Sequence, residues 1–349
     1  MKNYNTLVFI GRFQPFHLGH KSVIDHALKI AQNVIVLVGS ANCPRSTRNP
    51  WTWSERAKMI SENYDSVTNS RLWITPLNDI EYNDEQWIAN VNYAVKSLMI
   101  THGGDHNSIG LIGFSKDKSS YYLDMFPEWG SVNVSPWVSM QKVVSATEIR
   151  YDIFDNFTQQ KVEEIPSVKE HLSLETSKWI SDWMDSNPAA EYVRLEFFSE
   201  RKNKELWAQS PYPPTFVTVD AVVVQNGHVL LVKRKGYPGK GLWALPGGFV
   251  NVEETLVDSM IRELREETNL KVPEPVIRGS ITESHVFDAP KRSSRGRTIT
   301  HAYKIHLKRG SLPKVRGSDD AEKARWMKLR DIDPVMMFED HYSIIKCMV

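Results

Sequence analysis

The sequence predicts an α/β protein of two domains, the first built on a doubly wound parallel sheet and the second on a mixed or antiparallel sheet. The first 40 residues follow the pattern strand, turn, helix, strand. After the prolines of residues 210–214 the pattern changes to alternating β-branched residues. The length of 349 residues agrees with two domains, because one domain has about 150.

The N-terminal half opens as a βαβ unit. An apolar strand at 7–10 precedes a glycine-containing turn, an amphipathic helix at 20–32 and a buried strand at 34–38. A βαβ unit implies parallel strands. The same alternation predicts strands at 72–75, 109–114 and 142–144, and helices at 84–100, at 119–126 and from Ser145 onward.

The middle of the chain marks a boundary. Residues 173–210 are helical in pattern, with a break at Asn187-Pro188. We predict a first domain at 1–185, a helical linker at 186–211 and a second domain at 212–349. In the second domain Asn226-Gly227 separates two β-branched runs, the strongest short signal for a hairpin. The remaining predictions are strands at 215–224, 229–232, 276–282 and 300–307, a long helix at 255–268 and a short C-terminal helix.

Composition excludes several classes of function. The net charge is +1, so no global field favours nucleic acid or an anionic membrane. The two cysteines, Cys43 and Cys347, have neither metal-ligand nor disulfide spacing, and no apolar run approaches 18 residues. We therefore expect a cytoplasmic protein without nucleic-acid or membrane partners, and the oligomeric state stays open.

The first turn has features that suit the binding of phosphate. It runs from Gly11 to His20, where a glycine lets backbone amides approach phosphate and a new helix offers unpaired N–H groups. His17 and His20, three residues apart, can donate to the same phosphate oxygens. The alternative is a plain connection with surface histidines.

A second segment follows the strand at 142–144. Ser145 and Glu148 have the spacing of a capping box, and Arg150 lies one turn into the helix, where it can reach an anion. Taken alone, this segment is equally an ordinary helix start.

Together the two segments resemble the nucleotidyltransferase superfamily, which is marked by an HxGH turn and a later S-x-T-x-x-R segment. Residues 44–56, 79–87 and 116–123 look more specifically like nicotinamide mononucleotide (NMN) adenylyltransferases. The resemblance, over residues 5–155, implies a Rossmann-like domain that joins ATP to NMN, with His17, His20 and Arg150 as catalytic residues. The ATP and NMN contacts that it implies are Gly11, Phe13, Arg56, Trp87, Ser145, Thr147 and Arg150. For Trp53, Trp87 and Trp137 core packing is the alternative.

A cluster of carboxylates marks the second domain. Glu263, Glu266 and Glu267 have i, i+3 and i+4 spacing, which places them on one side of the predicted helix. Crowded carboxylates repel unless a hard divalent cation bridges them, which indicates Mg²⁺, with Mn²⁺ also suitable. The alternative is a solvated face of Glu and Arg pairs.

From Gly248 onward this string resembles the Nudix box, with Asn269 in place of the final glycine. Asn is the next best residue in the left-handed conformation of that position. The resemblance implies an α/β/α sandwich with a mixed sheet that hydrolyses a nucleoside diphosphate. It implies metal ligands at Glu254, Glu263, Glu266 and Glu267, and catalytic roles for Arg262, Glu263 and Glu267. The general base stays open, with Glu322 as one candidate.

Substrate choice must come from outside the box. The string is similar to that of ADP-ribose pyrophosphatases fused to adenylyltransferase domains, which implies contacts to ADP-ribose from Gly248, Phe287, Arg292, Arg295 and Arg297. All of these residues except Gly248 come from a basic loop at 287–298, which carries Lys291, Arg292, Arg295 and Arg297, and a mobile solvated loop is the alternative for it. The whole resemblance implies a bifunctional enzyme that makes NAD and cleaves ADP-ribose to AMP and ribose 5-phosphate. A non-hydrolytic ADP-ribose sensor, or the same reactions on other substrates, are the alternatives.

Overall fold

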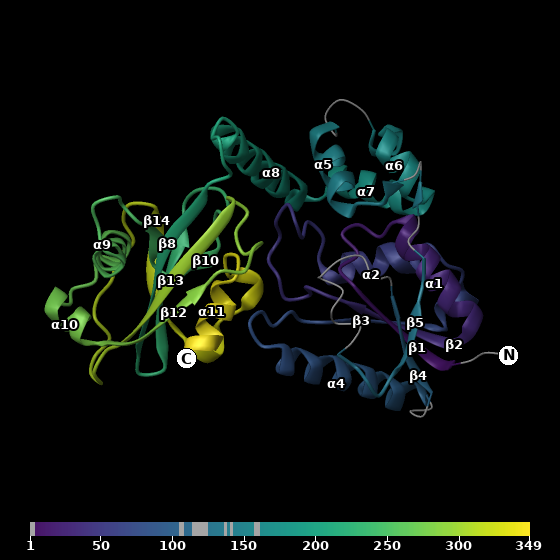
Figure 1. Ribbon diagram of the computed structural model, residues 1–349, viewed down its shortest axis with the longest axis horizontal. Helices are drawn as coiled ribbons and strands as arrows, with labels where there is room; N and C mark the ends of the chain where they lie inside the picture. Colours follow the sequence, from purple (N-terminus) through teal and green to yellow (C-terminus); the bar gives the residue numbers. More distant parts are fainter. Residues whose placement is uncertain (1–3, 105–107, 114–124, 136–137, 140–141, 157–160) are drawn as a thin grey trace. The chain divides into compact units, whose positions relative to one another are not determined.

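The computed structural model describes residues 4–104, 108–113, 125–135, 138–139, 142–156 and 161–349. The chain forms two compact units, Met1–Arg194 and Leu195–Val349 (Figure 1). Their division falls within α8 (Pro188–Trp207), the helix that occupies the predicted linker. The domain limits 1–185, 186–211 and 212–349 therefore stay predictions.

The first unit is built on a five-stranded parallel sheet in the order β3-β2-β1-β4-β5. This arrangement confirms the doubly wound sheet that the βαβ pattern predicts. Its strands are β1 (Tyr4–Gly11), β2 (Ala31–Val38), β3 (Leu72–Pro76), β4 (Ile109–Gly113) and β5 (Gly130–Asn133), with a small antiparallel pair of β6 (Val138–Ser139) and β7 (Lys142–Val143). Its helices are α1 (Leu18–Ile30), α2 (Trp53–Ser61), α3 (Ser66–Asn69), α4 (Asp84–His102), α5 (Ala146–Asn156), α6 (Pro166–His171) and α7 (Leu174–Ser186).

Strand β1 is buried on both faces. Val8 and Ile10 belong to the core cluster that includes Val91, Val95 and Met99 of α4. Leu7 and Phe9 are also buried, and side chains alternate along a strand, so they point to the opposite face. Helix α1 packs against β1, β2 and β4. The sheet is thus covered on both faces, and its carboxyl edge is free to carry a site.

The second unit is built on a seven-stranded mixed sheet. Strands β8 and β13 pair in parallel, and every other pairing is antiparallel. Asn226 and Gly227 have φ of 49° and 72°, which confirms the predicted hairpin turn. The strands are β8 (Thr215–Gln225), β9 (His228–Arg234), β10 (Trp243–Ala244), β11 (Gly247–Phe249), β12 (Ile281–Phe287), β13 (Arg297–His306) and β14 (Ala321–Lys328), and the helices are α9 (Leu256–Thr268), α10 (Glu274–Gly279) and α11 (His341–Met348).

Two cores lie on opposite faces of this sheet. Val219, Ala221 and Val223 of β8 pack with buried residues of α9, whereas Val222 and Val224 pack with buried residues of α11. The alternation along β8 confirms an α/β/α sandwich.

One predicted strand is wrong. Residues 276–282 divide between α10 and the start of β12 at Ile281. Pro273 caps α10 and a proline lies in its first turn, where the fixed φ of proline favours a helix. Most of the helix predicted at 119–126 lies outside the described residues. Among the residues that the structure describes, no helix is long and apolar enough to cross a membrane.

Candidate active sites

In the first unit the two histidines cap α1 reciprocally. The amide of His20 donates to Nδ1 of His17 (3.3 Å), and the amide of His17 donates to Nδ1 of His20 (3.4 Å). Their rings stack with centroids 3.7 Å apart. Because each Nδ1 accepts, the proton of each neutral ring lies on Nε2. The histidine pair thus carries N–H donors at a helix N-terminus, next to the carboxyl end of β1.

Phe13 supports this pair from within the protein. Its side chain is 1% exposed, and its ring lies edge-on to His20 at 4.8 Å. A Cβ at Gly11 would lie 2.9 Å from the Phe13 ring, so this packing requires glycine. The side chain of Phe13 is thus used in packing, and its contact with ATP or NMN stays a prediction.

The arginines expected to hold ATP are used inside the protein. Arg150 is 3% exposed and donates to the carbonyls of Gln14 (2.5 Å) and Thr47 (2.9 Å). Arg56 is 1% exposed and donates to the carbonyls of Arg12 and Gly39 at 2.5 and 2.6 Å. Both arginines hold the first turn against neighbouring loops.

The second segment is a helix start, as predicted. The amide of Glu148 donates to Oγ of Ser145, and Oγ1 of Thr147 accepts from Arg150 at 3.2 Å. Thr147 is exposed, so its hydroxyl is open to solvent. Arg150 belongs to this same helix, and its bond to the carbonyl of Gln14 connects the helix to the first turn.

Arg12 was missed by the sequence analysis. Its Nη1 is buried without a hydrogen-bond partner, and burial, together with nearby Arg48, lowers its pKa to about 10. A buried unpaired guanidinium nitrogen is costly, and an anion would satisfy it. The signal available in the sequence was an arginine directly after the turn glycine.

Trp87 lies near the start of α4 and is half-buried. It packs against the core under α4, with its ring 6.1 Å from Phe126. Core packing therefore accounts for part of its surface, and the contact with NMN stays a prediction. The motif at 116–123 and Trp137 lie outside the described residues.

In the second unit Arg262 gathers the carboxylates. It donates to Glu254 (2.8 Å), Glu263 (2.8 Å) and Glu266 (2.9 Å) from the middle of α9. Helix α9 starts after the Thr255 cap and ends at Asn269, whose φ of 50° confirms the predicted left-handed ending. The orienting role expected for Arg262 agrees with these contacts.

Glu267 is the buried member of the set. It is 7% exposed and accepts from the amide of Gly247 at 3.0 Å. Burial, with a contribution from Glu263, raises its pKa to about 8. A Cβ at Gly248 would lie 2.5 Å from Oε1 of Glu263, so glycine lets that carboxylate lie against the backbone.

These carboxylates fit a hard divalent cation by their chemistry. All four offer only oxygen, and the charges of Glu263 and Glu267 are close enough to disfavour each other. Across the described part of the chain, no three acidic, His or Cys side chains converge closely enough to hold an ion. The guanidinium of Arg262 lies between Glu254, Glu263 and Glu266 and donates to all three carboxylates.

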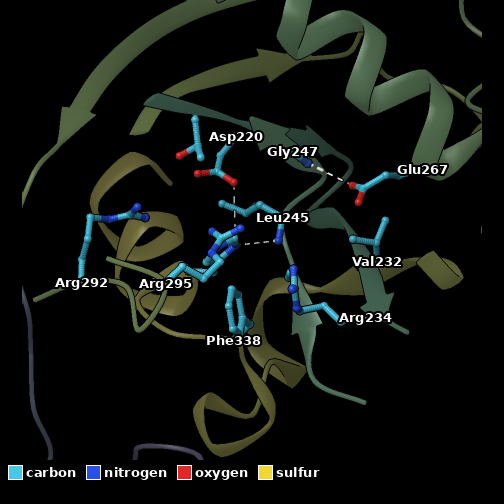
Figure 2. Close-up of a pocket in the computed structure, with 13 residues that line it drawn as sticks. Asp220, Val232, Arg234, Leu245, Gly247, Glu267, Arg292, Arg295 and Phe338 are labelled. Atoms are coloured by element: carbon cyan, nitrogen blue, oxygen red, sulfur yellow. Dashed lines mark hydrogen bonds and ion pairs between the residues drawn. The ribbon is translucent and has the colours of Figure 1, made fainter. Parts of the chain in front are cut away.

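A pocket opens beside Glu267 (Figure 2). Three arginines from two segments line it, Arg234 at the end of β9 and Arg292 and Arg295 from the basic loop. Burial and nearby Arg295 lower the pKa of Arg234. The pocket combines concentrated positive charge with a carboxylate wall, which suits a diphosphate next to a metal site. The remaining lining residues are Thr218, Asp220, Val232, Ala244, Leu245, Gly247, Gly248, Phe338 and His341.

The expected ADP-ribose contacts separate into two groups. Gly248, Arg292 and Arg295 line the pocket, and the guanidinium of Arg295 lies 4.9 Å from the ring of Phe249. Phe287 is 6% exposed within the core under α11, so core packing replaces the expected stacking.

Arg297 and Glu322 lie away from the pocket lining. Arg297 pairs with Asp288, and Glu322 lies 3.6 Å from Lys233 on the neighbouring strand. Sequence reasoning missed Asp220, Arg234, Phe338 and His341, because their convergence depends on strand pairing and on the docking of the C-terminal helix.

The two units match two different family models. A cytidylyltransferase-like model matches residues 8–108, and a NUDIX domain model matches residues 214–347.

Curated relatives divide in the same way. A nicotinamide/nicotinic acid mononucleotide adenylyltransferase of Acinetobacter baylyi is 39% identical over 150 residues, which are 43% of this chain and 76% of that protein. An ADP-ribose pyrophosphatase of Methanocaldococcus jannaschii is 34% identical over 145 residues, which are 42% of this chain and 79% of that protein.

A solved structure resembles the chain over almost its whole length. It is a bifunctional NMN adenylyltransferase/ADP-ribose pyrophosphatase from Francisella tularensis, complexed with AMP and a manganese ion. The TM-score is 0.87 at 33% identity, over 99% of this chain and 98% of that one. The chain therefore belongs to the family of bifunctional proteins that join an NMN adenylyltransferase to a Nudix ADP-ribose pyrophosphatase.

Proposed function

We propose that the chain transfers adenylyl from ATP to NMN, giving NAD and pyrophosphate, and hydrolyses ADP-ribose to AMP and ribose 5-phosphate. The observation that supports it is that each unit carries its own site: the His17–His20 pair in the first, and the carboxylates beside an arginine pocket in the second. Domains at 1–185 and 212–349, linked at 186–211, would carry the two reactions.

In the first unit the residues act by binding and by stabilising charge. The 5′-phosphate of NMN is already ionised near neutral pH, so no side chain has to remove a proton. The Nε2–H groups of His17 and His20 donate to ATP phosphate oxygens where negative charge develops. Arg12 supplies a further cationic donor, while Arg56 and Arg150 keep the turn in place. Trp87, at the start of α4, contacts nicotinamide.

In the second unit Glu254, Glu263, Glu266 and Glu267 would hold Mg²⁺, or Mn²⁺. When bound, the ion lowers the pKa of water and neutralises charge on the diphosphate. Arg262 orients the carboxylates, and Arg234 and Arg295 bind the diphosphate. Binding of the ion requires Glu263 and Glu266 to exchange part of their contact with Arg262 for the metal.

A two-part assay tests this assignment. We expect NAD from ATP with NMN, and AMP from ADP-ribose with Mg²⁺, from one preparation of the full chain. Nicotinic acid mononucleotide, NAD and sugar nucleotides complete the substrate panel. ADP-ribose that binds tightly but yields no AMP would support the sensor alternative. We also propose a cytoplasmic location, which agrees with the two free cysteines.

A further inference from the structure

A short segment before the C-terminal helix organises the hydrolase pocket. Oδ1 and Oδ2 of Asp340 each accept from Arg292 at 2.8 Å, in an ion pair whose two side chains are at most 2% exposed. Glu339 accepts from the amide of Ser294 at 2.8 Å. The basic loop is therefore held to the start of α11.

The next residue, His341, lines the pocket itself. It is 7% exposed, and its Nδ1 accepts from the backbone amide of Leu245 at 2.9 Å. Leu245 directly follows β10, and Phe338 donates to the carbonyl of Trp243 on that strand. Phe338 and His341 thus each form a hydrogen bond with the backbone at or just after β10 (Figure 2 labels Leu245 and Phe338).

This contact decides which ring nitrogen carries the proton. A backbone amide can only donate, so Nδ1 must offer its lone pair, and the proton of the neutral ring lies on Nε2. Asp220, an acidic neighbour, has Oδ1 4.0 Å from Nδ1 and accepts from Thr300 through Oδ2. Among the described residues, His341 makes no hydrogen bond through Nε2.

We propose that His341 is a specificity-determining residue of the hydrolase pocket, whose Nε2–H donates a hydrogen bond to an oxygen of a nucleoside diphosphate. The inference rests on the proposed hydrolase function and extends it. Arg234 and Arg295 attract any polyanion, whereas a neutral donor fixed in one direction selects an acceptor in one position. Burial also lowers the pKa of His341 to about 3, so the ring stays neutral across the physiological range.

Two substitutions separate the pocket contact from the structural contact. In His341→Asn the amide oxygen can replace Nδ1 as acceptor for Leu245, but no donor reaches the pocket. In His341→Gln the longer amide keeps a donor near the position of Nε2 and leaves the Leu245 amide unpaired. Both variants keep a neutral polar side chain.

We expect His341→Asn to raise KM for ADP-ribose about tenfold, the size of one neutral hydrogen bond, with kcat and Tm close to wild type. His341→Gln should keep KM within about threefold of wild type and lower Tm instead. Unchanged KM in His341→Asn overturns the proposal. If that variant does not fold, the glutamine variant decides, because a tenfold rise in its KM also overturns it.

The readout also separates this proposal from the proposed function. If wild type releases no AMP from ADP-ribose, the same variants are compared by calorimetry with AMP as the probe. About tenfold weaker AMP binding in His341→Asn then supports the histidine contact while the hydrolase assignment fails. A wild type that binds neither nucleotide overturns both.

Discussion

The two units place buried arginines against opposite kinds of acceptor. In the first unit Arg56 and Arg150 donate to neutral backbone carbonyls, and burial lowers the pKa of Arg56 to about 10. In the second unit the buried Arg292 donates to the carboxylate of Asp340, and the partly buried Arg262 also donates to carboxylates. Burial lowers the pKa of Arg292, but Asp340 and Asp220 more than offset it, so its pKa is raised.

The difference shows how the partners of an arginine determine whether its positive charge is available to a ligand. Carbonyl partners leave the guanidinium charge uncompensated, so the first site keeps a positive potential suited to a triphosphate. Carboxylate partners cancel that charge, so in the second site the attraction for a diphosphate depends on Arg234 and Arg295. Each unit can thus be inactivated through different residues, and the following predictions test this separation.

The largest effect is expected from Glu267→Gln, which replaces a carboxylate oxygen proposed to bind the metal at nearly constant shape. Losing several kcal/mol of charge stabilisation corresponds to about a 1,000-fold fall in ADP-ribose hydrolysis. NAD synthesis by the same preparation should not change, since its site lies in the other unit. Glu253→Gln, at an exposed position just before the helix, is the matched control. Loss of both activities together would contradict the separation.

The reciprocal test is His20→Ala. It removes one N–H donor from the developing charge, which costs about 3 kcal/mol, or more than a 100-fold fall in NAD synthesis. ADP-ribose hydrolysis should stay at the wild-type rate. His26→Ala, an exposed histidine on the same helix, controls for the loss of a ring from α1. Near-normal turnover of ATP and NMN by His20→Ala would show that the pair does not bind phosphate.

A third prediction concerns stability in acid and applies to the second unit alone. The folded pKa of His341 is about 3, below the value of about 6.5 for an unfolded histidine, so the unfolded chain takes up the proton first. Its contribution to stability is complete above pH 6.5 and is lost as the pH falls toward 3. The charged groups that act on His341 are Asp340, Arg292, Arg234 and Arg295, with Asp220 4.0 Å away.

Between pH 7 and pH 5 the free energy of unfolding of this unit should fall by about 2 kcal/mol from this residue. Denaturant unfolding at both pH values measures the fall, and His341→Asn should remove it. An equal fall in the variant would assign the pH dependence to other groups.

The features that could be predicted from the sequence are those set by residues close together in the chain. The Asn226-Gly227 hairpin and the left-handed helix ending at Asn269 depend on a few adjacent residues, and both were predicted. The prediction of a strand at 276–282 was wrong. Its apolar β-branched residues favour a strand, but the prolines before them begin a helix.

The site residues show the same limit. Arg150 was recognised as an important residue, but its carbonyl partner at Gln14 lies 136 positions away, so its internal role depends on the fold. His341 shows no local signal, since its partner Leu245 lies 96 positions earlier. Motifs thus predict which residues are important for the site. Contacts between residues far apart in the sequence determine whether those residues face the ligand or the protein interior.

The smallest effect is expected where the Nudix box departs from its pattern. Asn269 ends α9 with φ of 50° and ψ of 34°, a conformation that costs a residue with a Cβ about 1–2 kcal/mol and that Asn tolerates best after Gly. Asn269→Ala should therefore lower the free energy of unfolding by about 1 kcal/mol, and Asn269→Gly should leave it unchanged or slightly higher. Denaturant unfolding of both variants measures this. ADP-ribose hydrolysis should persist in each, because Glu267 is held by the Gly247 amide and not by the helix end. Loss of hydrolysis in Asn269→Gly would show that Asn269 itself contributes to the site.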